Sequence, residues 1–181
     1  MNLRLVEYEE TDSTNEAAKR LVRDAENTGL LQAGEVYGYV ITAKRQTAGK
    51  GRRGKSFFSP GGDSIYASFI LPPPENPAEQ QITTLAGAAV CEAIKKASGR
   101  QDAAPTIRGV NDVLVEGRKV CGILTEGIPG AVIIGIGINI NLEEEDFPEE
   151  LRDSAGSLRL TEEERERLFK SLADAMISLK F

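Results

Sequence analysis

One short segment of this chain carries most of the features that could bind an anion. Residues 44–55, KRQTAGKGRRGK, hold six basic side chains and no acidic one, although the protein has a formal net charge of −6. Gly49, Gly51 and Gly54 permit unusual backbone angles and close approach of a ligand. Arg52 supplies a guanidinium fork that matches carboxylate or phosphate oxygens. The segment predicts a loop that orders over a small anionic ligand; a merely solvated loop is the alternative.

Part of this segment also fits the spacing of a nucleotide-binding P-loop. Residues 49–56, GKGRRGKS, match G-x-x-x-x-G-K-[ST]. In a P-loop, a buried strand enters and a helix leaves, so that amides at the helix N-terminus point at the phosphates. Here the entering segment is polar, and the exit runs through Pro60-Gly61-Gly62, which cannot begin a helix. We therefore interpret the match as accidental.

The absence of histidine from the sequence restricts the chemistry of the chain. A Ser–His or Cys–His nucleophile pair and an imidazole metal site are excluded. The two cysteines, Cys91 and Cys121, are too few for a disulfide framework or a zinc site. Any catalysis must therefore use lysine, arginine, carboxylates, amides and the backbone.

Charge and hydropathy indicate the setting of the protein and its partners. No apolar run approaches the roughly 20 residues that cross a bilayer, so no membrane association is predicted. The N-terminus lacks the apolar stretch of a secretory signal, and the simplest setting is a reducing cytoplasm. The acidic net charge argues against nucleic acid as a partner.

The elements that must position the basic loop are mostly strands. Strands are predicted at 3–10, 37–43, 64–71 and 131–141, and a hairpin over 106–127 that turns at Glu116-Gly117. Because the strands occur in runs and the helices are few, we expect an α/β (α+β) fold. It would be a mixed, mostly antiparallel sheet with helices packed on one face. With 181 residues and no evident linker, a single domain over 1–181 is expected.

Helix starts are predicted at Ser13, near Asn76 and at Thr161. Ser13 with Glu16, and Thr161 with Glu164, have the spacing of a capping box, in which two side chains satisfy backbone amides reciprocally.

Four segments, in this order, resemble the motifs of one family. They are TDSTN (11–15), QTAGKGRRGKSFFSP (46–60), GRKVCGILTE (117–126) and IGIGININ (134–141). Together they resemble biotin–protein ligases, or biotin–[acetyl-CoA carboxylase] ligases, of the biotin/lipoate protein ligase superfamily. The resemblance covers roughly residues 3–181 and implies a catalytic fold similar to that of class II aminoacyl-tRNA synthetases.

The resemblance also implies an activity. The family joins biotin to ATP, with Mg²⁺ as activator, and releases pyrophosphate and biotinyl-5′-AMP. Biotin is then transferred to a lysine of a biotin carboxyl carrier domain, such as that of acetyl-CoA carboxylase. This chemistry suits a chain without histidine, because it depends on positioning and on neutralising charge.

By the same resemblance, each motif supplies candidate site residues. The catalytic residues would be Lys119 and Arg52. Biotin would be bound by Ser13, Thr14, Asn15, Gln46, Gly49, Arg52, Lys119 and Gly122. The nucleotide would be bound by Lys50, Arg53, Phe57, Arg108, Asn111, Asp112 and Asn139, with Asp112 also near Mg²⁺.

Several of these residues also have a purely structural interpretation. Ser13 and Thr14 could serve solely as capping residues of a helix. Gly122, like Gly135 and Gly137, could serve solely to allow close packing of strands. Asn111-Asp112 could be an ordinary turn pair.

The chain departs from the family pattern in two places. Where the family has K-W-P, residues 108–110 read Arg108-Gly109-Val110, which alters a wall of the pocket and leaves the acyl group open. The sequence also begins at Met1 and ends at Phe181, so neither an N-terminal DNA-binding domain nor a C-terminal β-barrel is expected. The alternative to a ligase is a non-catalytic or divergent homologue that binds biotin or another carboxylate or acyl-adenylate.

Overall fold

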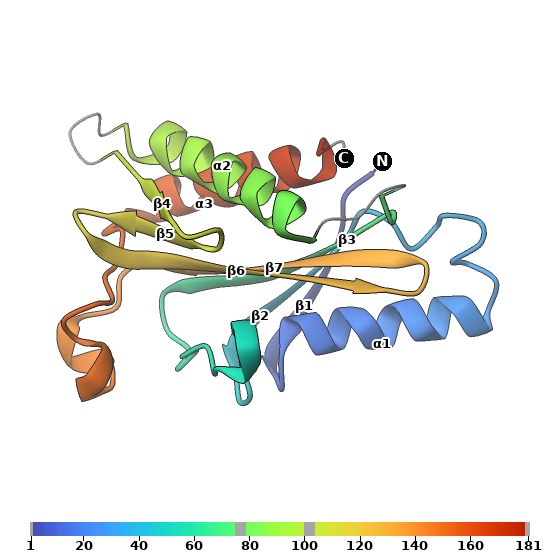
Figure 1. The fold of residues 1–181 in the computed structure, drawn as a ribbon, viewed down its shortest axis with the longest axis horizontal. Helices are drawn as coiled ribbons and strands as arrows, with labels where there is room; N and C mark the ends of the chain where they lie inside the picture. Colours follow the sequence, from blue (N-terminus) through green and yellow to red (C-terminus); the bar gives the residue numbers. More distant parts are fainter. Residues whose placement is uncertain (1, 75–78, 100–103, 180–181) are drawn as a thin grey trace.

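The computed structural model describes residues 2–74, 79–99 and 104–179. They form one seven-stranded sheet and three α-helices (Figure 1). The elements are β1 (Arg4–Thr11), α1 (Thr14–Asn27), β2 (Tyr39–Gln46), β3 (Ser64–Leu71), α2 (Glu79–Ser98), β4 (Thr106–Arg108), β5 (Asp112–Val115), β6 (Arg118–Ile128), β7 (Ala131–Asn139) and α3 (Glu162–Ile177).

The strand order is β1-β2-β3-β7-β6-β5-β4. Among the described residues β1 and β2 pair in parallel, and every other neighbouring pair is antiparallel. The expected mixed, mostly antiparallel sheet is therefore confirmed. Strands β3 and β7 lie in its middle and are buried along their whole length, which explains their nearly continuous apolar sequences.

Helices cover both faces of this sheet, which corrects the expectation that they all pack on one face. Helices α2 and α3 lie on one side and α1 lies on the other (Figure 1). Alternate residues of a strand point to opposite faces. Accordingly Val40 and Phe69 join the core under α2 and α3, whereas Ile41 and Ile70 join the core under α1. Because both faces of the central strands are apolar, both need a cover.

The two capping boxes predicted from the sequence have different outcomes. Thr161 Oγ1 accepts a bond from the Glu164 amide at 3.3 Å, and the Glu164 carboxylate accepts one from the Thr161 amide at 2.8 Å. Ser13 is the N-cap residue of α1, but its side chain makes no cap bond, and that prediction is wrong. The Glu16 carboxylate instead accepts bonds from two lysines. The helix start near Asn76 lies outside the described residues.

The hairpin turn at Glu116-Gly117 is confirmed and brings two of the predicted site residues, Asp112 and Gly122, together. Both residues have positive φ, 52° and 79°, as expected for a tight two-residue turn. The turn joins β5 to β6, so that Asp112 pairs with Gly122 across the ladder. A register shift between Val113 and Leu114 interrupts the pairing there.

The basic loop is not followed by an α-helix, and the described helices are not of the membrane-spanning kind. After β2 the chain makes one short 3₁₀ turn at Arg52–Gly54 and then continues without the α-helix of a P-loop. Within the described ranges, no helix combines the length and the apolar character needed to span a membrane.

Candidate functional site

The four motifs converge on one cavity of ≈ 340 Å³. The start of α1, the basic loop after β2, the start of β5 and the middle of β6 and β7 all contribute to its wall. Most of the predicted site residues line it: Ser13, Thr14, Asn15, Gln46, Lys50, Arg52, Arg53, Phe57, Asn111, Asp112, Lys119 and Gly122. Segments far apart in sequence thus meet in one place, as the motifs indicated.

Three predicted residues lie elsewhere. Arg108 and Asn139 line a smaller cavity of ≈ 120 Å³, which shares Phe57 and Lys119 with the larger one. Gly49 is buried within the loop, where a Cβ would come within 2.5 Å of the Phe57 carbonyl oxygen. The backbone of Gly49 accepts a bond from the Phe57 amide at 2.8 Å. Gly49 therefore serves the packing of the loop, and the other predicted residues divide between two adjoining cavities.

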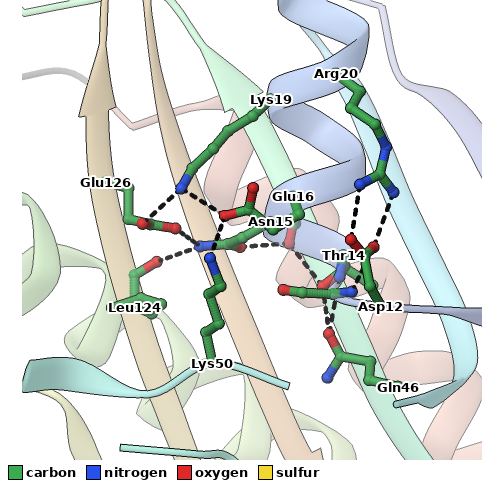
Figure 2. Close-up of polar contacts among 12 residues, drawn as sticks. Asp12, Thr14, Asn15, Glu16, Lys19, Arg20, Gln46, Lys50, Leu124 and Glu126 are labelled. Carbon is green, nitrogen blue, oxygen red and sulfur yellow. Dashed lines mark hydrogen bonds and ion pairs between the residues drawn. The ribbon is translucent and has the colours of Figure 1, made fainter. Parts of the chain in front are cut away.

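A hydrogen-bonded group forms the polar end of the larger cavity (Figure 2). The Gln46 side-chain oxygen accepts bonds from the amide and the hydroxyl of Thr14, at 2.8 and 3.2 Å. The Gln46 nitrogen donates to Ser59 Oγ at 2.8 Å. These bonds fix the orientation of the Gln46 amide, and no described residue accepts a bond from its second N–H, which is left for a ligand.

Asn15 builds the wall behind this polar end. Its side-chain nitrogen donates to the Glu126 carboxylate at 2.7 Å and to the Leu124 carbonyl at 3.3 Å (Figure 2). Its side-chain oxygen accepts a bond from Ser68 Oγ at 2.6 Å. Because both amide protons of Asn15 are used within the protein, its donors are not available to a ligand.

Sequence reasoning did not identify Ser68 or Glu126 as part of this group. Ser68 is fully buried, and its hydroxyl also bonds Thr14 Oγ1 at 2.8 Å. A polar residue inside the apolar strand SIYASFIL was the available signal, since buried hydroxyls need partners. Glu126 is the last residue of the motif GRKVCGILTE, but its role could not be predicted because its partners, Asn15 and Lys19, come from another element.

Glycines form the floor of the cavity, and the Phe57 ring lies on them. Gly122 and Gly137 are directly opposite one another in the β6–β7 ladder. A Cβ at Gly122 would lie 2.7 Å from Phe57 Cε2, and one at Gly137 would lie 2.6 Å from Phe57 Cζ. A Cβ at Gly135 would collide with the Asn15 amide. These glycines make room for side chains of the site, not only for neighbouring strands.

Charged groups gather at the other end. Lys119 Nζ lies 2.8 Å from Asp112 Oδ1 and 5.7 Å from the centroid of the Phe57 ring. Arg52 donates to Asn111 Oδ1 at 3.1 Å, and Arg108 reaches Asp112 Oδ2 at 3.5 Å. Three cations therefore surround the Asn111-Asp112 pair. This end of the cavity has the excess of positive charge that a carboxylate or a phosphate requires.

Lys50 lines the cavity but does not join this charged end. Its Nζ lies 2.6 Å from Glu16 Oε1, at the start of α1 (Figure 2). Hydrogen bonds from Lys19, and to a smaller extent from Lys50, hold the pKa of the Glu16 carboxyl below its usual value. Arg53, in the 3₁₀ turn of the loop, has a left-handed backbone with φ 56°.

The charged end of the cavity contains a carboxylate, Asp112, that could contact a metal ion, and a buried thiol, Cys121, lies close by in the sequence. The described residues contain no cluster of three or more His, Cys, Asp or Glu side chains that could hold a metal. Magnesium is often held by one or two carboxylates together with substrate phosphates, a role that Asp112 fits. Cys121 is 1% exposed, and burial raises the pKa of its thiol. Its thiolate is therefore disfavoured, and the side chain acts as core filling.

Comparisons with known sequences agree on one family. The profile described as the biotin/lipoate A/B protein ligase family matches residues 9–143. The bifunctional ligase/repressor BirA of Bacillus subtilis is 37% identical over 165 residues, 87% of this chain and 47% of that protein. A biotin–[acetyl-CoA-carboxylase] ligase of Paracoccus denitrificans is 35% identical over 135 residues, 73% of this chain and 52% of that protein. The chain thus spans about half the length of these relatives.

Solved structures give the same result for the fold. The biotin protein ligase from Aquifex aeolicus, in complex with biotin and ATP, superposes with a TM-score of 0.72 at 29% identity. The match covers 96% of this chain and 70% of the Aquifex chain. The Leishmania major enzyme in complex with biotinyl-5-AMP gives a TM-score of 0.73 at 20% identity, over 96% of this chain and 74% of that one.

Proposed function

Because the chain belongs to the biotin/lipoate A/B protein ligase family, we propose that it is an ATP-dependent biotin–protein ligase of the cytoplasm. The observation that carries this proposal is the polarity of the cavity along its length. Hydrogen-bonding groups around Gln46 lie at one end, glycines form the floor, and Lys119 and Arg52 lie at the charged end. A ligand with a polar head, an apolar tail and a terminal carboxylate fits that sequence of groups.

Biotin is such a ligand. Its polar ring would meet the Ser13 and Thr14 hydroxyls and the free N–H of Gln46, and its tail would run over Gly122 and Gly137. Its carboxylate would end beside Lys119 and Arg52. Phe57 rests on the two glycines, so we expect its ring to move aside and cover the adenine of the nucleotide.

The first step would join two anions. A biotin carboxylate oxygen attacks the α-phosphorus of ATP, the bond to the bridging oxygen of the β-phosphate breaks, and pyrophosphate leaves with the electron pair. Lys119 and Arg52 would hold both anions and stabilise the charge that develops in the transition state. Arg108 and Asn139 would contact the nucleotide from the smaller cavity, and Arg53 would contact it from the basic loop, in the wall of the larger cavity. Mg²⁺ would be held by Asp112 with phosphate oxygens, whose charge it offsets.

The second step would transfer biotin to a protein. The amine of a carrier lysine attacks the acyl carbon, the bond to the phosphate oxygen breaks, the amine loses a proton, and AMP leaves. The partner we propose is the biotin carboxyl carrier domain of acetyl-CoA carboxylase or a similar carboxylase. Support comes from the Paracoccus relative, which is named for that carboxylase.

Direct detection of the intermediate tests the first step. We expect biotinyl-AMP to form on incubation with biotin and Mg·ATP, and Lys119→Gln to reduce its rate at least about 100-fold, because one charged transition-state contact is lost. Lys95→Gln, which breaks an exposed ion pair on α2, is the matched control and should leave the rate unchanged. Normal turnover by folded Lys119→Gln would contradict the assigned role.

One observation favours a second candidate, activation of a different carboxylate. Gly109 occupies the turn between β4 and β5 with φ 64°, and a Cβ built there meets no atom within 4 Å. Where the family has tryptophan, the chain therefore leaves open space next to Arg108, which lines the smaller cavity. A bulkier acid than biotin would find room at this edge, and comparison of acids in the same assay separates the two candidates.

A further inference from the structure

The basic loop is tied to the rest of the protein by side chains on two sides. Lys50 reaches Glu16 on α1 at 2.6 Å, and Arg52 reaches Asn111 beside β5 at 3.1 Å. Within the loop, the Gly51 amide donates to the Lys55 carbonyl at 2.7 Å. The loop is therefore closed on itself as a compact turn, and the two side-chain contacts join it to opposite walls of the cavity.

Glu16 is well suited to be the fixed side of this contact. It lies in the first turn of α1, and its side chain is 23% exposed, against 48% for Lys50. The same Glu16 oxygen lies 2.9 Å from Lys19 Nζ, and Lys19 lies 2.7 Å from Glu126 on β6 (Figure 2). Glu16 is thus held by its own helix and, through Lys19, by the sheet.

The charge arrangement favours the same role. A carboxylate near the N-terminus of a helix is stabilised by the helix dipole. Bonds from both lysines also favour its ionised form, and they lower the pKa of Glu16. An anionic side chain in a fixed position can hold a lysine of a glycine-rich loop whose backbone has little intrinsic preference.

We propose that Glu16 is a positioning residue that holds the basic loop over the cavity through Lys50. Lys50 precedes Arg52 by two residues, so the contact also presents Arg52 to the charged end of the site. A loop held over the cavity would also slow the escape of a bound ligand. That consequence rests on the proposed function, since the ligand would be the acyl-adenylate. The contact itself is a property of the folded chain and can be measured without substrates.

Limited proteolysis measures loop opening directly, because trypsin cleaves after Arg52 and Arg53. We expect Glu16→Gln to increase the rate of cleavage at these two bonds about threefold at low salt, the effect of losing one partly exposed ion pair. Lys50→Gln should give the same increase, and the double variant should add nothing further. Lys50→Arg, which keeps the charge, should restore slow cleavage. Cleavage sites are identified by mass spectrometry, so the loss of a site at residue 50 does not interfere.

The matched control is Glu10→Gln, which removes the exposed Arg45–Glu10 pair on the neighbouring strands at 2.7 Å. It should leave cleavage of the loop unchanged. Equal melting temperatures exclude global unfolding as the cause, and Lys50→Gln keeps the test valid if Glu16→Gln is unstable. Additive effects in the double variant, or unchanged cleavage in both single variants, would overturn the proposal.

A second readout separates this proposal from the proposed function. If the chain forms biotinyl-AMP, Glu16→Gln should release it about threefold faster, and the single-turnover rate of its formation should change less than its release. If no adenylate forms but the cleavage results hold, the proposed function fails and the positioning role stands. If adenylate forms normally while cleavage is unaffected by either variant, the positioning role fails alone.

Discussion

At the scale of single residues, the site depends as much on absent side chains as on charged ones. Gly122 and Gly137 leave a space that Phe57 fills, and Gly135 leaves the space that Asn15 fills. The G-x-G spacing of β7 places its two glycines on one face of the strand, which the sequence reveals. Which side chain enters that space could not be predicted, because Phe57 reaches it from a loop about 80 residues earlier in the chain.

A methyl group added to this floor tests its role in binding. We expect Gly137→Ala to weaken biotin binding at least about tenfold and to lower the melting temperature, since the new Cβ lies 2.6 Å from Phe57 Cζ. Adding Phe57→Ala should recover the melting temperature but not the affinity, because the methyl still occupies the path of the biotin tail. Calorimetric titration and thermal unfolding of the two variants, with Phe57→Ala alone as control, measure both. Full recovery of affinity would show that Phe57 alone was responsible.

At the scale of elements, the junction of β1 and α1 presents Ser13 and Thr14 to the cavity. The guanidinium of Arg20 bonds both Asp12 oxygens at 2.8 Å and fastens the end of the strand to the helix (Figure 2). Sequence patterns predicted the position of this helix but not how its first turn is satisfied. The Ser13–Glu16 box looked complete locally, whereas Glu16 bonds Lys50, which lies 34 residues later.

The Asp12–Arg20 pair gives this junction a dependence on pH. Hydrogen bonds from Arg20 hold the pKa of Asp12 well below its ordinary value of 3.8. A lowered pKa in the folded state means that the carboxylate stabilises the fold above the unfolded value, and that this contribution is lost as the pH falls below about 4. We therefore expect the melting temperature of the wild type to fall more steeply than that of Asp12→Asn below about pH 4. Parallel melting curves of the two proteins at successive pH values would contradict this.

At the scale of the whole molecule, the sheet is covered on both faces and the site lies where the motifs meet. The apolar runs of β3 and β7 were identifiable in the sequence as buried strands. Their pairing as neighbours, and the assignment of α1 to one face with α2 and α3 on the other, were not. Both depend on contacts between residues far apart in the chain, which local patterns do not record.

Because helices cover both faces of the sheet, substitutions between a helix and the sheet should lower the free energy of unfolding most. Leu172 of α3 is fully buried in the core between that helix and the sheet. We expect Leu172→Ala to reduce the free energy of unfolding by about 2–5 kcal/mol, through lost burial and the cavity left behind. Urea denaturation measures the loss. Leu30→Ala, at a leucine that is 44% exposed, is the control, and an equal cost at both positions would contradict the assigned core.

Exchange of labelled pyrophosphate into ATP, in the presence of Mg²⁺ and with or without biotin, tests the central claim most directly. It reports the reversible attack of a carboxylate on the α-phosphorus and requires no carrier protein. A biotin ligase gives exchange that depends on biotin, exceeds that with other carboxylic acids, and is lost in Lys119→Gln. Tight biotin binding without exchange would contradict catalysis and indicate a binding protein. Exchange with another acid but not with biotin would contradict the proposed substrate.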